Sequence, residues 1–232
     1  MIPNWAFLSS KKKVIKHVPE NKIKLMEYDR SQWLKYFGVD NPALQISNIG
    51  AYSIAKPQMG EQLADFIVSI LGSTKNMTVT ETHGGLGGFS IPLSRMFKKV
   101  QSVEIEKVHA DILKNNAKVF GRSNINVINS DYMNQMKTLS QDVIVSDPPW
   151  GGRDYIDKKC ISLGINNIDV VHIINELAAN NKFNLFVLLV PGNYDFNNLF
   201  LRLNLSSENL TVRMVHYGKK KYFYIGIRAQ IQ

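Results

Sequence analysis

Residues 142–152 read Asp142-Val143-Ile144-Val145-Ser146-Asp147-Pro148-Pro149-Trp150-Gly151-Gly152. The first part is a short apolar run rich in β-branched residues, which is typical of a buried strand and too short for an ordinary helix. A carboxylate, two prolines, a tryptophan and two glycines follow at once. In an open α/β sheet, ligands bind beyond the carboxyl ends of the strands. The stretch therefore predicts a buried strand that carries a functional motif at its C-terminal end.

The residue types of this motif suit the binding of a planar amine. Pro148 and Pro149 fix φ and lack N–H donors, so the turn presents carbonyl oxygens and a carboxylate. The exocyclic NH2 of a base is a double donor. Asp147 and the Pro148 carbonyl would accept its two hydrogens and aim the nitrogen at an electrophilic methyl group. Trp150 offers a flat face for the base, and the glycines let the chain turn away. The plainer alternative is a Pro-Pro turn beside a packed tryptophan.

The motif also carries a family resemblance. Asp147-Pro148-Pro149-Trp150 is similar to the catalytic motif of amino-group methyltransferases, and the string extended through Gly152 resembles that of the trimethylguanosine synthases. The resemblance extends from near Ser53 to near Asp195. It implies a Rossmann-like class I fold, S-adenosylmethionine as cofactor and methyl transfer to the 2-amino group of a 7-methylguanosine RNA cap. It further implies that Asp147, Pro148 and Trp150 are catalytic.

A glycine-rich turn precedes the motif in the chain. Residues 77–81 are predicted to form the first strand, and His-Gly-Gly-Leu-Gly-Gly at 83–88 follows before a helix near Phe89. Glycines placed between a strand and a helix let the backbone approach a nucleotide-like ligand, although many α/β proteins have such a turn. We expect Gly85 and Gly87 to contact the cofactor, together with Glu81. Family members usually have aspartate where Glu81 and Glu104 stand.

Two more strand ends carry acids. The strand at 100–104 ends in Glu104, about 20 residues after the glycine turn, where an acid binds ribose hydroxyls in nucleotide-binding sheets. The strand at 125–129 leads to Asp131, in the expected place for a carboxylate that accepts the adenine amine. Each acid alone could be an ordinary surface residue. Four sites in this order, each at the end of its own strand, favour one ligand site.

Other segments extend the resemblance. Residues 52–58 are similar to a cofactor-contacting segment of the family, which includes Ser53, although one residue is inserted before Pro57 and no threonine is present. The run Asn115-Asn116-Ala117 also matches. Family members usually carry a basic residue, facing the cap phosphates, where this chain has Gly192. The expected cofactor-binding residues are Ser53, Glu81, Gly85, Gly87, Glu104, Asp131 and Asp147, and the expected substrate contacts are Trp150, Asn193 and Lys56.

The first 50 residues differ in charge from the rest and hold eight basic and four acidic residues. Lysines alternate there with Trp5, Phe7 and Tyr28, which suits phosphates and stacked bases, but a solvated arm is an equal alternative. Ser31 is predicted to cap a short helix that packs Trp33, Leu34 and Phe37 on one face and ends at Gly38. We expect residues 1–50 to form a basic extension of the substrate pocket and residues 51–232 to form the methyltransferase domain.

Beyond Trp150, residues 151–166 are predicted to form a polar, mobile flap. A helix at 169–179 and a strand at 183–190 follow, and a hairpin of residues 210–217 and 221–228 around Gly218 closes the chain. Lysines at its tip could serve solubility alone. The predicted fold is a Rossmann-like α/β domain of about seven mostly parallel strands with an antiparallel C-terminal hairpin and a small helical N-terminal extension.

Composition limits the possible functions. The chain has 232 residues, 44% of them hydrophobic, and a formal net charge of +9, which favours a polyanionic partner such as capped RNA. No apolar run is long enough for a membrane span. Cys160 is the single cysteine and the five histidines lack ligand spacing, so we expect neither a disulfide nor a metal site. We expect an intracellular monomer, in the host cell if the source is viral, with nuclear and cytoplasmic locations left open.

Two rival functions fit the same residues. The first is an adenine-N6 or other amino methyltransferase acting on RNA or DNA. Members of that group that use Asp-Pro-Pro-Trp often place it before the glycine motif, whereas here the glycines come first. The second is an inactive RNA-binding subunit that kept the fold, against which the intact Asp147 and glycine turn argue.

Overall fold

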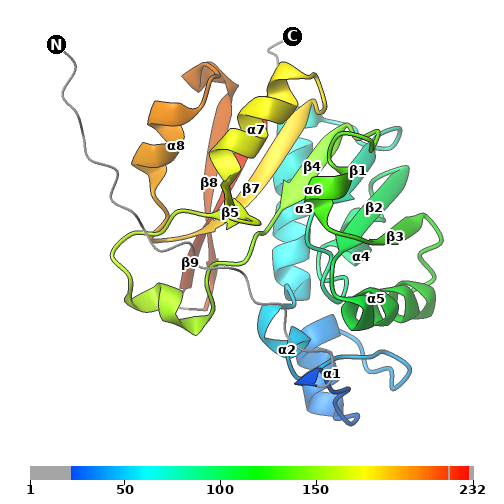
Figure 1. Ribbon diagram of the computed structural model, residues 1–232. Helices are drawn as coiled ribbons and strands as arrows, with labels where there is room; N and C mark the ends of the chain where they lie inside the picture. The colour runs from blue at the N-terminus through cyan, green and yellow to red at the C-terminus, as the bar shows by residue number, and fades with distance from the viewer. Residues whose placement is uncertain (1–21, 219, 230–232) are drawn as a thin grey trace, which may run out of the picture.

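A seven-stranded sheet forms the centre of the computed structural model, which describes residues 22–218 and 220–229 (Figure 1). The predicted roles of Trp5, Phe7 and the lysines at 11–16 lie outside the described residues. The strands are β1 (Thr78–Glu81), β2 (Lys99–Glu104), β3 (Ile125–Asn129), β4 (Val143–Ser146), β7 (Leu185–Pro191), β8 (Leu210–Tyr217) and β9 (Lys220–Arg228).

The strand order is β3-β2-β1-β4-β7-β9-β8, and only β9 runs antiparallel to its neighbours β7 and β8. This arrangement confirms the predicted Rossmann-like sheet with an antiparallel C-terminal hairpin. The chain moves outward from β1 to β3 and then returns to β4 on the other side of β1. Such a reversal opens a crevice at the carboxyl ends of the two strands that flank it, here β1 and β4.

Helices cover both faces of the sheet. They are α1 (Arg30–Phe37), α2 (Gly50–Ser53), α3 (Pro57–Leu71), α4 (Ser90–Leu93), α5 (Lys107–Val119), α6 (Tyr132–Gln135), α7 (Val170–Ala179) and α8 (Phe196–Arg202). Because side chains alternate along a strand, Ile144 of β4 packs in the core beneath α7, while Val143 and Val145 pack in the core beneath α3. Figure 1 shows α7 in front of the sheet and α3 behind it.

Residues 22–55, called the N-terminal segment below, pack against α5. Trp33 is 1% exposed, and its Nε1–H donates to the Leu44 carbonyl at 2.9 Å. The predicted Ser31 cap is wrong, because Asp29 accepts the Gln32 N–H and also the Ser31 hydroxyl. Leu34 was expected to pack with Trp33 and Phe37, but it is exposed, since neighbouring helical residues point in different directions.

The polar flap expected at 151–166 is only half correct. A 3₁₀ turn, η2 (Arg153–Asp157), is followed by apolar residues that enter the core, among them Ile161, Leu163 and Ile165. A small antiparallel pair, β5 (Gly164–Ile165) and β6 (Ile168–Asp169), leads into α7. The flap proper therefore ends near Lys159. A second 3₁₀ turn, η3 (Ser207–Asn209), precedes β8.

No helix among residues 22–218 and 220–229 has the length and apolar character to cross a membrane.

Candidate active site

The carboxyl ends of β1 to β4 meet at one edge of the sheet. Glu81 at the end of β1 lies opposite Ser102 of β2 and Val145 of β4, and Glu104 at the end of β2 lies opposite Asn129 of β3. Parallel strands in this register bring Glu81, Glu104, Asp131 and Asp147 to the same side of the domain. The structure thus places all four predicted acids along one edge.

The glycine turn after β1 is held by hydrogen bonds at successive peptide groups. Gly84 N donates to the Val103 carbonyl at 2.8 Å, and Gly85 N donates to Glu104 Oε2 at 2.7 Å. Gly87 has a φ of +95°, a conformation that favours glycine. A Cβ on Gly84 would collide with the Ser102 hydroxyl. The turn is therefore a close-packed loop whose backbone can approach a ligand.

Glu104 is the acid best placed to serve that ligand. It is 7% exposed, and burial raises the pKa of its carboxyl group. Oε2 accepts the Gly85 N–H and Oε1 accepts the Glu106 N–H at 2.8 Å. An ionised carboxylate has about four lone-pair sites, so each oxygen keeps one acceptor site for a ribose hydroxyl. The geometry suits the predicted role.

Glu81 has a different environment. It is 3% exposed and accepts hydrogen bonds from the hydroxyls of Ser90 and Ser102, which are themselves buried. Burial raises the pKa of Glu81 to about 8. Its carboxyl group therefore joins the start of α4 to β2, beneath the glycine turn.

Asp131 and Ser53 lie at helix ends. Asp131 caps α6, because its Oδ1 accepts the Met133 N–H at 2.9 Å, while its Oδ2 accepts the Asn166 amide. An adenine amine would share or displace the Asn166 contact. Ser53 is the exposed last residue of α2, and its hydroxyl is 3.4 Å from the Gly50 carbonyl.

Lys56 stands at the start of α3. Its ammonium group lies 3.7 Å from the centre of the Tyr36 ring, a cation–π contact. Burial, with a smaller effect of the nearby Lys35, lowers the pKa of Lys56 to about 8. The residue therefore links α1 to the start of α3.

Trp150 of the Asp-Pro-Pro-Trp motif contacts two tyrosines. Its ring centre is 5.2 Å from that of Tyr155, which meets it edge-on, and 5.5 Å from that of Tyr222. Burial raises the pKa of Asp147 to about 7, and the nearby indole N–H, the only donor of the Trp150 side chain, lowers it. The buried Nε1 therefore lies close to Asp147 but outside good hydrogen-bond geometry. The motif thus combines an ionisable acceptor with a half-buried indole.

Asn193 holds the flap. Its side-chain N–H groups donate to the carbonyls of Tyr155, at 2.7 Å, and Lys158, at 2.8 Å. Gly151 and Gly152 begin the flap with φ values of +94° and +81°. Because both amide hydrogens of Asn193 are used within the protein, its direct contact with a substrate is limited to Oδ1. Cys160, just beyond Lys158, is exposed.

Two lysines lie near the places where the motif and Gly192 leave their strands. Lys158 Nζ lies 3.7 Å from the point that a Cβ on Gly151 would occupy. A Cβ on Gly192 would lie 3.7 Å from Lys221 Cβ, because β7 and β9 are neighbours. Lys221 therefore begins next to the position where the resembled family carries its basic residue.

Sequence reasoning missed Tyr155 and Tyr222 as ring partners of Trp150. Side chains alternate along β9, so Tyr222 and Tyr224 share one face of the sheet and Phe223 lies on the other. Which residue that face would meet depends on the pairing of β9 with β7, a long-range contact that no local pattern reports. The role of Asn116, described below, was missed for the same reason.

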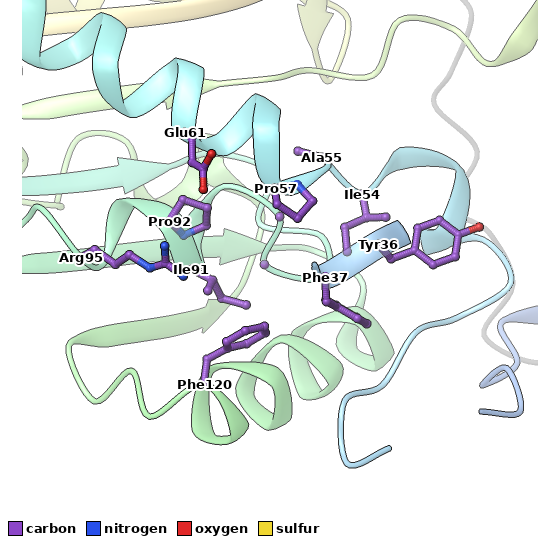
Figure 2. Close-up of a pocket in the computed structure, with 12 residues that line it drawn as sticks. Tyr36, Phe37, Ile54, Ala55, Pro57, Glu61, Ile91, Pro92, Arg95 and Phe120 are labelled. Carbon is purple, nitrogen blue, oxygen red and sulfur yellow. The ribbon is translucent and has the colours of Figure 1, made fainter. Parts of the chain in front are cut away.

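A cavity lies beside the glycine turn and is lined in part by Gly87 and Gly88. Figure 2 shows Phe37, Ile54, Pro57 and Phe120 around it, together with Pro92 of α4. None of the four strand-end acids lines this cavity. Among the described residues, no group of three or more His, Cys, Asp or Glu side chains is placed to hold a metal ion. The candidate active site is therefore the carboxylate-lined edge.

The strand order, the glycine turn after β1 and the Asp-Pro-Pro-Trp motif after β4 define a Rossmann-like class I methyltransferase. A family model described as RNA cap guanine-N2 methyltransferase matches residues 76–228, and the chain belongs to this family of RNA methyltransferases.

Relatives and solved structures agree with this class. An uncharacterized protein of Acanthamoeba polyphaga mimivirus is 27% identical over 208 residues, which cover 87% of this chain and 80% of the viral protein. The trimethylguanosine synthase of Schizosaccharomyces pombe is 24% identical over 119 residues, 48% of each chain, so the match spans about half of that enzyme.

Two solved structures share the fold. The human methyltransferase 10 domain-containing protein has a TM-score of 0.59 at 12% identity and covers 77% of this chain and 84% of its own. The Thermus thermophilus 16S rRNA N2 G1207 methyltransferase, solved with AdoMet and guanosine, has a TM-score of 0.54 at 16% identity and covers 74% of this chain and 43% of its own.

Proposed function

We propose that this protein transfers a methyl group from S-adenosylmethionine to the exocyclic 2-amino group of a 7-methylguanosine RNA cap. The observation that carries the proposal is the position of Asp147 and the half-buried Trp150 beside the glycine turn at one edge of the sheet. The family description and the similarity to the S. pombe synthase support the same reaction.

S-adenosylmethionine fits the residues at this edge. The close-packed turn at Gly85 and Gly87 would lie along the ligand, Glu104 would accept the ribose hydroxyls and Asp131 would accept the adenine amine, with Ser53 nearby. Glu81 would support the turn from below, because its carboxyl group accepts a hydrogen bond from Ser90 at the start of α4. When bound, the cofactor supplies an electrophilic methyl group.

Asp147 and the Pro148 carbonyl would orient the acceptor amine. Both are acceptors, so they bind an NH2 group through its two hydrogens and leave its nitrogen directed away from them. Orientation of this kind contributes several kcal/mol, up to about 7–11 at best, to the lowering of the barrier. The nitrogen becomes acidic only as it gains the methyl group, and no strong base is needed before that point.

Trp150 would stack on the methylated guanine, and the two lysines would bind the phosphates. A 7-methylated guanine is cationic near neutral pH, so an indole face gains a charge–π contribution of about 0.5–2 kcal/mol beyond ordinary stacking. Lys158 beside Gly151 and Lys221 beside Gly192 flank the motif. We infer that Lys221 supplies the positive charge that the resembled family has at the Gly192 position.

The N-terminal 50 residues are proposed to complete the substrate pocket. Lys56 and Tyr36 already join α1 to the start of α3 close to Ser53. The net charge of +9 supports an RNA partner.

A methyl-transfer assay tests the function directly. Purified protein and labelled S-adenosylmethionine are incubated with a 7-methylated cap dinucleotide, with an unmethylated cap and with an adenine-containing oligonucleotide. The expected result is label on the 2-amino group of the methylated cap. Label on adenine alone would establish the rival amino methyltransferase, and no S-adenosylmethionine binding at all would establish an inactive subunit.

A further inference from the structure

Asn116, in α5, joins two segments that are distant in the sequence. The residue is fully buried. Its Oδ1 accepts the Gln45 N–H at 2.8 Å, and its Nδ2 donates to the Gln45 carbonyl at 2.9 Å, so the amide pairs with the N-terminal segment as a neighbouring strand would. Nδ2 also donates to the Leu86 carbonyl at 3.1 Å. One side chain therefore contacts both the N-terminal segment and the glycine turn.

The N-terminal segment covers the glycine turn closely. Leu86, at the middle of the turn, is 1% exposed and packs in a cluster with Trp33 and Ile46. A Cβ on Gly50 would lie 2.7 Å from Leu86 Cγ, and a Cβ on Gly88 would lie 2.7 Å from the Ala55 nitrogen. These contacts leave no room for the turn to move outward while the N-terminal segment stays in place.

Glu104, the residue proposed to bind the ribose hydroxyls, also holds the turn. Glu104 accepts the Gly85 N–H, and the Leu86 carbonyl, on the adjoining residue, accepts from Asn116. Two neighbouring residues of the turn are thus fixed from opposite directions. A ligand that engages Glu104 would stabilise the turn, and the turn is bonded to the N-terminal segment through Asn116.

We propose that Asn116 is a positioning residue that couples the N-terminal segment to the cofactor-binding turn. Occupation of the cofactor site stabilises residues 43–47, and loss of the Asn116 amide weakens cofactor binding. Coupling of this kind is reciprocal, because each event changes the equilibrium of the other by the same factor. The proposal rests on S-adenosyl ligands binding at the glycine turn and does not depend on which RNA is methylated.

The first test is calorimetric binding of S-adenosylhomocysteine to variants. Asn116→Asp keeps the acceptor for Gln45 N but cannot donate to Gln45 O or to Leu86 O, and Asn116→Ala removes all three bonds. Each variant is expected to bind S-adenosylhomocysteine about tenfold more weakly, the size expected for loss of the one bond that reaches the turn. Asn115→Ala is the matched control, because Asn115 donates to the Ala43 carbonyl at 2.8 Å and more weakly to Asn116 Oδ1 at 3.4 Å, and its side chain makes no bond to the turn.

Ser47→Ala separates positioning from general stability. The Ser47 hydroxyl lies 3.0 Å from His109 Nε2 of α5 and accepts the Gly50 N–H, so its loss removes two local contacts and leaves the bonds of Asn116 to Gln45 and to Leu86 intact. The control variants are expected to bind S-adenosylhomocysteine within about threefold of the wild-type protein. Equal losses in Asn116→Ala and Ser47→Ala would overturn the proposal, since they would assign Asn116 a purely structural role.

Hydrogen exchange of the wild-type protein and of Asn116→Ala is a second test. S-adenosylhomocysteine is expected to slow amide exchange in residues 84–88 and also in residues 43–47 of the full chain. In Asn116→Ala, the ligand should protect residues 84–88 only. Protection confined to 84–88 in the wild-type protein would overturn the coupling. Absence of any binding by the wild-type protein would instead refute the proposed cofactor and thereby remove the basis of the coupling.

Discussion

At the scale of single residues, the proposed preference for a methylated cap depends on Trp150. Tyr155 and Tyr222 fix its ring, so its exposed face is presented in one orientation. A fixed aromatic face loses little conformational entropy on binding, which favours affinity.

Replacement of Trp150 by leucine should remove the preference for methylated cap. The charge–π contribution of about 0.5–2 kcal/mol corresponds to a preference of about 2- to 30-fold in the wild-type protein. Fluorescence titrations with both caps measure the ratio, which should approach one in Trp150→Leu and stay intermediate in Trp150→Phe. Equal affinities for the two caps in the wild-type protein would contradict the stacking argument.

Asp147→Asn should weaken orientation of the amine without loss of cofactor affinity. The neutral amide oxygen is a weaker acceptor than an ionised carboxylate, so turnover should fall at least tenfold, or about 1.4 kcal/mol. In the wild-type protein, activity should rise as pH increases through about 7, because burial raises the pKa of Asp147 to about 7 and the ionised form is the better acceptor. Pre-steady-state turnover at several pH values measures both effects.

The turnover of Asp147→Asn is compared with its affinity for S-adenosylhomocysteine. Unchanged affinity with lost turnover supports orientation of the nucleophile. A variant that keeps more than a tenth of the wild-type rate would show that Asp147 does not orient the amine.

At the scale of elements, the flap and its anchor determine where Tyr155 lies. Gly192 and Asn193 follow the end of β7. The Asn193 side chain donates to the carbonyl of Tyr155, in the 3₁₀ turn η2, and to that of Lys158, just after the turn. The isolated bridge between Ile161 and Tyr194 fixes the far end of the same segment. The flap is therefore attached at Tyr155 in its middle, at Lys158 near its end, and at Ile161 just beyond it.

Asn193→Ala should raise the KM for cap several-fold while S-adenosylhomocysteine affinity stays constant. Loss of two hydrogen bonds, each about 0.5–1.5 kcal/mol, frees Tyr155 from the Trp150 ring. Steady-state kinetics with varied cap concentration measure the effect. Asn180→Ala is the control, because Asn180 donates to the Glu176 carbonyl at the end of α7, away from the site. An equal rise in KM for both variants would refute the anchoring role.

The elements that the sequence predicted well are those with strong local signals. The strand predicted at 125–129 matches β3, and the predicted glycine stop of α1 is Gly38 with a φ of +73°. The short helices α6 and α8 were not predicted, since a four-residue helix and a seven-residue helix give little periodic signal. Ile161, Leu163 and Ile165 alternate with other residues in a segment read as polar, and their burial depends on α7 and β7.

In the candidate site, too, the sequence predicted the positions of residues better than their contacts. Positions at strand ends, such as Glu104 and Asp131, follow from the alternation of strands and helices, because parallel strands share one carboxyl edge. What each side chain contacts does not follow. The sequence could not indicate that Glu81 faces two serines, or that Asn193 uses both N–H groups on the flap, because those contacts depend on packing between distant segments.

At the scale of the whole molecule, buried acids make stability depend on pH. The folded protein keeps a proton on Glu81 up to about pH 8, whereas the ordinary pKa of a glutamate is 4.5. The contribution of Glu81 to the free energy of unfolding is therefore fully present below pH 4.5 and is lost as pH rises to about 8. Asp147 contributes in the same direction up to about pH 7.

The free energy of unfolding should therefore fall between pH 6 and pH 8, and Glu81→Gln should reduce the fall. At about 1.4 kcal/mol per pH unit, Glu81 accounts for about 2–3 kcal/mol over this range. Urea unfolding at the two pH values measures the difference. Asp65→Asn, which changes an exposed acid of α3, should leave the difference unchanged. A Glu81→Gln protein with the wild-type pH dependence would show that Glu81 is ionised when the protein is folded.

The position of Cys160 has a practical consequence. It is the single cysteine of the chain, it is exposed, and it follows the flap carbonyl that Asn193 holds. A thiol-reactive dye would therefore attach at one known point without mutagenesis, ten residues along the chain from Trp150. Energy transfer to that dye from the three tryptophans of the chain, Trp150 among them, followed after rapid mixing with cap, would report whether the flap changes position and at what rate.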